Sequence, residues 1–203
     1  MDGGQYIIRI MSKKDTEDLE KLVRQAQNKD SEALAILYEI LYPKIFHYVA
    51  FRINDEEIED QVADIFLKMV EKLSYYRPKK GASFTSWIFR IAHNHVVDSY
   101  RRKKEVTLAP FSGADEKEDY FLQIPDEKNP NPHQITVDKS NAKVLQTALK
   151  KIPVHYREIL EFKYFHDLNN TEISHITGKS EGNIRILQMR GLEKMREVLP
   201  EVF

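Results

Sequence analysis

The sequence predicts an all-α protein made of two small helical domains joined by a flexible acidic linker. Apolar residues recur at three-to-four-residue spacing towards both ends of the chain, which is typical of helices with one buried face. Residues 105–138 lack this period and contain four prolines and the acidic cluster DEKED. No segment shows the strict alternation expected of a strand. We therefore expect a first domain at residues 1–104 and a second at residues 139–203.

Charge is distributed unevenly along the chain, whose formal net charge is only −1. Residues 1–104 carry 18 Lys and Arg against 16 Asp and Glu, and residues 139–203 carry 11 against 8. Residues 105–138 carry 2 against 8. Contact with a polyanion would therefore depend on local basic patches in the two domains.

Several missing features narrow the possible functions. Without cysteine, the chain has no disulfide, cysteine-ligated zinc or thiol nucleophile. It has no phosphate-binding glycine loop, nucleophile elbow or HExxH motif, and the spacing of His93 and His95 puts their rings on different helix faces. No apolar run or leading segment suits a membrane span or a signal peptide. We expect a soluble cytoplasmic protein that is not an enzyme and binds neither cofactor nor metal.

The first domain contains four amphipathic segments separated by turn-forming residues. Helices are expected over about residues 15–26, 33–49, 58–73 and 84–104. Pro43 lies inside the second segment and predicts a kink or a short break there. Pro78 and Gly81 predict a loop between the third and fourth segments. That loop is basic, because it carries Arg77, Lys79 and Lys80.

The second domain ends in two helices joined by a tight turn, at residues 171–198. Two helices precede them, with Pro153 in the first turn of the later one. Thr171 can cap the first helix of the pair, Gly178 suits a left-handed C-cap, and Ser180 can cap the second helix. One buried stripe on the second helix consists of Ile184, Leu187, Gly191 and Met195.

A short helix, a glycine turn and a longer helix form a helix-turn-helix, whose second helix can enter the DNA major groove. The outward positions of this second helix include Asn183, Arg185, Met189 and Arg190. Arginine is the usual reader of guanine, and apolar groups can contact the thymine methyl. The alternative is an ordinary helical hairpin whose arginines are only solvated.

Three stretches together resemble a known family. EDQVADIFLKMVEKL (59–73) is similar to the family's EDLVQEVFL helix, and SFTSWIFRIAHNHVVDSYRR (83–102) is similar to its F..WL..IA.N...D..RR stretch. IPVHYREILEFKYFHDLNNTEISHITGKSEGNIR (152–185) is similar to its LP...R helix and the EIA-type helix-turn-helix that follows. In this order and spacing they resemble the extracytoplasmic-function (ECF) sigma factors of bacteria, which keep only the second and fourth conserved sigma regions.

The resemblance implies a sigma factor that binds core RNA polymerase and directs promoter-specific transcription initiation. Residues 59–73 would dock on the polymerase clamp through Glu59, Asp60, Asp64, Phe66 and Leu67. The first domain would recognise and melt the −10 element through Arg77, Lys79, Lys80, Arg90, Asn94, Arg101 and Arg102. The second would bind the double-stranded −35 element through Thr171, Ser180, Asn183, Arg185, Ile186, Met189 and Arg190. An anti-sigma factor that holds the two domains together is a further expected partner.

Physical chemistry agrees with this assignment of the −10 surface. A melted strand exposes base faces and edges that a protein can stack on or capture. Arg90 and Asn94 lie four residues apart and so share one side of the fourth helix. Tyr75, Tyr76 and Phe84 could stack on bases, or they could belong to the core.

Two other classes of function remain open from the sequence. A stand-alone helix-turn-helix regulator would use the second domain for DNA and the first for dimerisation or sensing, and it would bind specific DNA without polymerase. A helical adaptor protein would have neither activity. The segments RIAHN and EDQVADIFL favour the sigma interpretation, because a simple regulator needs neither.

Overall fold

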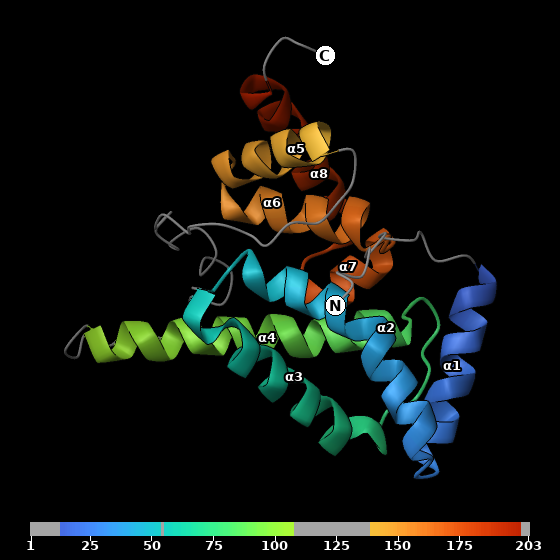
Figure 1. The fold of residues 1–203 in the computed structure, drawn as a ribbon. Coiled ribbons are helices and arrows are strands. Elements are labelled where there is room, and N and C mark those ends of the chain that lie inside the picture. The colour runs from blue at the N-terminus through green and yellow to red at the C-terminus, as the bar shows by residue number, and fades with distance from the viewer. Residues whose placement is uncertain (1–12, 54, 108–138, 200–203) are drawn as a thin grey trace.

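The computed structural model describes residues 13–53, 55–107 and 139–199. In this part of the chain every regular element is a helix, and the only strand-like pairing is a single bridge between Lys79 and Ala82 (Figure 1). The prediction of an all-α fold is therefore confirmed. None of the helices in the described ranges has the length and apolar character that crossing a bilayer requires. The acidic cluster DEKED lies outside the described residues.

The first half consists of α1 (Lys13–Gln27), α2 (Ser31–Ala50), the 3-10 turn η1 (Asp55–Glu57), α3 (Ile58–Leu73) and α4 (Phe84–Thr107). Asp30 caps α2, because its side chain accepts the backbone N–H groups of Glu32 and Ala33. Of the kink or short break predicted at Pro43, the break is absent, since α2 continues through this residue. Helix α4 runs beyond the predicted boundary at residue 104, into the segment assigned to the linker.

The second half consists of α5 (Lys139–Lys151), α6 (Val154–Leu160), the π-helical turn η3 (Glu161–Phe165), α7 (Asn170–Thr177) and α8 (Glu181–Val198). Arg157 is buried and its guanidinium donates to the carbonyl oxygens of Leu149 (2.8 Å) and Lys150 (2.9 Å). These bonds satisfy backbone carbonyl groups at the C-terminal end of α5, which have no partner within the helix, and they hold α5 against α6.

The two halves share one continuous apolar core, which the sequence analysis does not predict. Side chains of α2, α3 and α4 form most of it, and Phe162, Ile173 and Ile184 of the second half complete the same cluster. Figure 1 shows α7 lying beside α4, with α5 on the side of the second half that is turned away from the first. A smaller cluster around Leu149 and Met195 holds α5, α6 and α8 together.

Candidate nucleic-acid and polymerase interfaces

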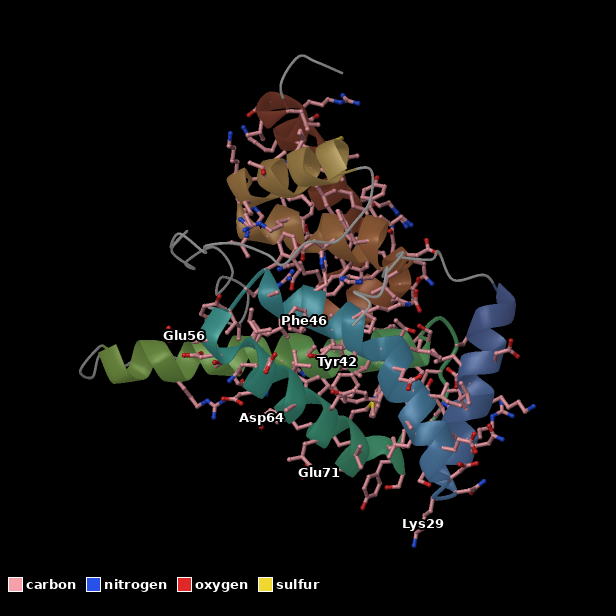
Figure 2. The ribbon with its side chains drawn as sticks, viewed as in Figure 1. Lys29, Tyr42, Phe46, Glu56, Asp64 and Glu71 are labelled. Carbon is pink, nitrogen blue, oxygen red and sulfur yellow. The ribbon has the colours of Figure 1, made fainter. Side chains whose placement is uncertain are left out.

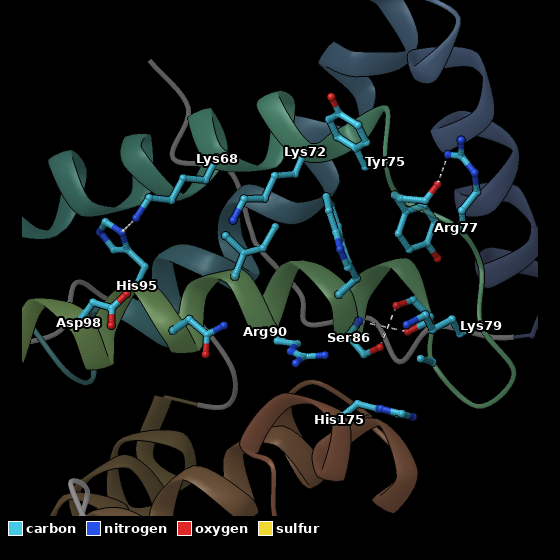
Figure 3. A pocket seen from close by; sticks show the side chains of 16 residues that line it. Lys68, Lys72, Tyr75, Arg77, Lys79, Ser86, Arg90, His95, Asp98 and His175 are labelled. Atoms are coloured by element: carbon cyan, nitrogen blue, oxygen red, sulfur yellow. Dashed lines mark hydrogen bonds between the residues drawn. The ribbon is translucent and has the colours of Figure 1, made fainter. Parts of the chain in front are cut away.

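A basic cavity of about 510 Å³ lies between α3, α4 and the loop that joins them. Figure 3 shows Lys68 and Lys72 reaching from α3, Arg90 on α4 and His175 on α7 at the facing side. The basic residues that line the cavity are Lys68, Lys72, Arg77, Lys79 and Arg90. Asp98 is the one carboxylate among the lining residues, so the cavity favours an anionic ligand.

Four of the seven residues predicted for the −10 surface line this cavity: Arg77, Lys79, Arg90 and Asn94. Lys80 is exposed in the loop but does not line the cavity. Arg101 and Arg102 are exposed farther along α4 and likewise lie outside the lining. The structure therefore divides the predicted set into four residues that line the cavity and three exposed residues that lie outside it.

Of the three aromatic residues considered for base stacking, the structure leaves only Tyr75 available. Tyr75 is 81% exposed and lines the cavity. Tyr76 is buried and its hydroxyl donates to Glu20 (2.8 Å), while Phe84 is fully buried. Their ring centroids are 5.0 Å apart, and both pack on Trp87. Tyr76 and Phe84 are thus core residues that support the cavity wall.

Lys68 and Lys72 are functional candidates that the sequence analysis missed, because their helix was assigned wholly to polymerase docking. Lys68 donates to Nδ1 of His95, whose Nε2 in turn lies 2.8 Å from the Gln61 side-chain oxygen. Burial, followed by the charge of Lys68, lowers the pKa of His95. The neutral ring therefore positions the Lys68 ammonium at the cavity. The four-residue spacing of the two lysines, which places both on one face of α3, was the sequence feature that could have indicated them.

The helix-turn-helix has the predicted turn but a different first cap. Asn169, and not Thr171, caps α7, because Asn169 and Glu172 form a reciprocal capping box. Thr171 lies within α7 and its hydroxyl donates to Glu181 (2.8 Å), which ties the two helices together. Gly178 has φ 74° at the C-cap, and the Ser180 side chain accepts from Asn183, so both of those predictions are confirmed.

The predicted reading face of α8 is open to solvent. Its residues Asn183, Arg185, Ile186, Met189 and Arg190 are all exposed. On the opposite side, Ile184 is fully buried, and a Cβ at Gly191 would lie 3.2 Å from the Leu160 side chain. Close packing of α8 on α6 therefore fixes which face turns outward. Arg185 makes only an exposed contact with Glu181 at 3.4 Å, which is weak enough to exchange for DNA.

The outward face of α3 is acidic with an apolar centre. Glu59, Asp60 and Asp64 are exposed, and Leu67 is 59% exposed. Figure 2 shows Asp64 and Glu71 along the outer edge of the helix. Phe66, in contrast, is 5% exposed and its ring lies 4.5 Å from that of Tyr38. We therefore assign Phe66 to the core side of α3 and leave it out of the docking surface.

Comparison with known proteins identifies both halves. A family model described as "Sigma-70 region 2" matches residues 37–106, and one described as "Sigma-70, region 4" matches residues 142–195. The chain is 26% identical over 188 residues to the ECF RNA polymerase sigma factor SigW of Bacillus subtilis, covering 91% of this chain and 98% of SigW. It is 24% identical over 191 residues to the ECF RNA polymerase sigma factor BldN of Streptomyces coelicolor, covering 92% and 68%.

A solved structure shows a similar fold. CnrH, in complex with the cytosolic domain of CnrY, aligns with a TM-score of 0.59 at 19% sequence identity. The alignment covers 88% of this chain and 94% of CnrH.

Proposed function

The chain belongs to the extracytoplasmic-function group of the sigma-70 family, a group of transcription initiation factors. From this premise we propose a separate function for each of three surfaces. Helix α3 docks on core RNA polymerase, α8 reads the double-stranded −35 element, and the basic cavity holds the melted −10 strand. The observation that carries the proposal is the cavity, which brings basic, amide and aromatic groups from two helices and a loop together.

Capture of a melted base explains this combination of side chains. A base that leaves the stack needs a polar edge partner, a stacking surface and neutralisation of its phosphate. Asn94 offers the amide, Tyr75 offers an exposed ring and Arg90 offers a cation, and all three line the same cavity. Binding the unpaired strand more tightly than the duplex shifts the equilibrium towards the open promoter.

The proposed partners are core RNA polymerase, promoter DNA and an anti-sigma factor. Leu67 and Val70 are large apolar residues exposed on α3, 59% and 45% respectively, which suits a surface that a partner protein covers. An anti-sigma factor seated on α3 would compete directly with polymerase.

Reconstituted transcription tests the proposal. Purified protein, bacterial core polymerase and genomic fragments should yield discrete transcripts that neither protein gives alone. Specific DNA binding by the isolated protein, with no transcript when core polymerase is added, would instead indicate a stand-alone regulator.

Arg185→Ala is expected to weaken recognition of one base pair in the upstream element. Loss of a bidentate arginine–guanine contact costs about 1–3 kcal/mol and relaxes specificity at that position. Abortive transcription from a panel of single-base promoter variants measures the effect. Arg196→Ala is the matched control, because Arg196 is exposed on the last turn of the same helix. An unchanged base preference in Arg185→Ala would exclude Arg185 as a reader.

Charge reversal at Asp60 and Asp64 is expected to weaken binding to core polymerase while leaving the fold intact. Both carboxylates are exposed, and the contact of Asp64 with His95 Nε2 is long (4.0 Å), so their reversal removes complementarity at an interface and not internal packing. Co-purification with core polymerase measures binding, and circular dichroism measures helix content. Asp18→Lys with Glu39→Lys reverses two exposed carboxylates elsewhere in the first half and serves as control. Equal recovery of core polymerase by the two double variants would refute docking through α3.

A further inference from the structure

The ring of His95 is buried between α3 and α4, at the lining of the basic cavity. Its side chain is only 1% exposed. Lys68 donates to its Nδ1 at 2.5 Å, across the space between the two helices (Figure 3). On the other side of the ring, Nε2 lies 2.8 Å from the side-chain oxygen of Gln61. A buried titratable group is thus bonded directly to a cation of the cavity.

The two contacts of His95 fix which ring nitrogen carries the proton. An ammonium group can only donate hydrogen bonds, so Nδ1, which faces Lys68, has to be the unprotonated acceptor. The proton of the neutral ring is then on Nε2, where the Gln61 oxygen accepts it. The ring is therefore held as the Nε2–H tautomer, with the lone pair of Nδ1 directed at Lys68.

Lys68 keeps donors for a second partner while it is bound to His95. Its ammonium group has three N–H bonds, and the ring accepts one of them. Lys72 is exposed one helical turn farther along α3 and lines the same cavity. In the described part of the chain, neither lysine forms a salt bridge with a carboxylate. The α3 wall therefore offers the cavity two cations that no carboxylate neutralises.

This wall is suited to the backbone of a nucleic-acid strand. Lysine binds phosphate as a point charge, so its contacts add affinity without reading a base. Base contacts are available from Asn94 on α4 and from the exposed ring of Tyr75, which line the same cavity. A strand that places a base against these groups can turn its phosphates towards α3.

We propose that His95 is a positioning residue for strand capture, whose neutral ring holds the Lys68 ammonium group at the α3 wall, where it binds a backbone phosphate of the melted strand. The inference rests on the proposed function, because it assumes that the cavity holds this strand. Lysine has a long, flexible side chain, and ordering it during binding costs conformational entropy. A lysine that is already ordered by His95 avoids most of that cost.

The same bond makes strand capture depend on pH. Burial, followed by the charge of Lys68, lowers the pKa of His95 below its ordinary value, so the ring is neutral at neutral pH. As the pH falls through this lowered pKa, Nδ1 gains a proton and repels the ammonium group. In the free protein Lys68 can turn away from the protonated ring, whereas a bound phosphate holds it there. DNA therefore favours the neutral ring, and by linkage its binding weakens as the pH falls.

Other charged groups around the ring do not reverse the sign of this effect. Asp64 of α3 lies 4.0 Å from Nε2 and raises the pKa of His95, as does Asp98 of α4, while Arg102 lowers it. Each of these effects is smaller than that of burial. His175 of α7 also lines the cavity, but its protonation adds a cation and so strengthens the binding of an anion. Weaker binding in acid therefore points to His95.

Binding of reconstituted polymerase holoenzyme to a fork-junction DNA tests the proposal. The probe has a double-stranded −35 element and a single-stranded −10 region, so binding does not require melting. Lys68→Gln should weaken binding at least about fivefold at neutral pH. It should also reduce the slope of log affinity against log salt by about 0.7, the value for one phosphate of a single strand.

Substitutions of His95 separate its role from simple packing. His95→Leu removes the acceptor and should weaken fork binding at least about threefold, with no further loss when it is combined with Lys68→Gln. His95→Asn keeps an acceptor oxygen but does not titrate, so it should bind more tightly than His95→Leu. The affinity of the wild type relative to His95→Asn should fall at least about threefold between about pH 7.5 and pH 5.5. This ratio cancels titration of other groups in the holoenzyme.

Lys72→Gln is the matched control, because it removes a cation from the same wall without touching the ring. It should reduce the salt slope but keep the pH dependence of the wild type. Circular dichroism at each pH establishes that every variant is folded. Additive losses in His95→Leu and Lys68→Gln, or the same pH dependence in His95→Asn and the wild type, would overturn the proposal.

Nitrogen NMR of the free protein distinguishes failure of this inference from failure of the proposed function. The ring shifts of His95 should show the proton on Nε2, and Lys68→Gln should raise the pKa of His95, because a neighbouring charge that lowers it is removed. A proton on Nδ1 would refute positioning by the ring even if fork binding is normal. If the wild-type holoenzyme binds the fork no more tightly than the fully double-stranded promoter, strand capture itself fails, while the NMR result still decides whether the ring holds Lys68.

Discussion

Arg90→Ala combined with Asn94→Ala is expected to lower the rate of promoter opening by about a hundredfold or more. A good polar contact to a base edge contributes about 1–3 kcal/mol, and each 1.4 kcal/mol changes an equilibrium about tenfold. Both side chains are exposed, line the same cavity and lie one helical turn apart on α4, so they act on the same stretch of strand. Their loss removes affinity for the melted strand and leaves duplex recognition by α8 intact.

Two measurements separate this effect from a general loss of activity. Permanganate reactivity of unpaired thymines reports opening on a duplex promoter, and a template with a pre-formed bubble removes the need to melt. The double variant should fail on the duplex and recover partly on the bubble. Arg24→Ala with Asn28→Ala is the control, because it removes the same two residue types, four apart and exposed, near the end of α1. Normal opening by the Arg90/Asn94 variant would disprove strand capture in the cavity.

The sequence was sufficient to predict those elements that depend only on residues close together in the chain. The helix-turn-helix could be predicted because Gly178 needs a left-handed backbone and Ser180 can cap the next helix, and both follow from neighbouring residues alone. The outward face of α8 followed from the buried spacing of Ile184 and Gly191. Thr171 was predicted as the cap from its residue type, whereas the reciprocal bonds between Asn169 and Glu172 cap the helix, and residue type does not reveal which candidate is used.

Features that depend on distant residues could not be predicted in the same way. Tyr48 and Glu158 are 110 positions apart, and nothing around either one indicates a partner. Glu161 and Phe162 also lie in a π-helical turn, which changes the side-chain direction that an α-helical period predicts. Lys68 and Lys72 required the positions of both α3 and α4 before their place at the cavity became evident.

Phe89→Ala is expected to lower the free energy of unfolding by about 3–5 kcal/mol, the usual cost of removing a fully buried aromatic side chain. Phe89 has no exposed surface. The centroid of its ring lies 5.7 Å from that of Tyr48, 5.6 Å from that of Phe162 and 4.4 Å from that of His166. The cavity left behind would adjoin residues of both halves, and a close-packed interior closes such a cavity only in part. Urea unfolding followed by circular dichroism measures the loss.

Phe46→Ala is the appropriate comparison, because Phe46 lies on the same core but is only partly buried. Its replacement removes a ring of the same size while leaving a site that water can enter, so it should cost less than half as much. The fluorescence of the single tryptophan, Trp87 in α4, adds a probe confined to the first half. If the halves share a core, tryptophan fluorescence and circular dichroism should give coincident wild-type unfolding curves. Equal costs for Phe89→Ala and Phe46→Ala, or separated wild-type curves, would show that Phe89 does not lie in a core common to both halves.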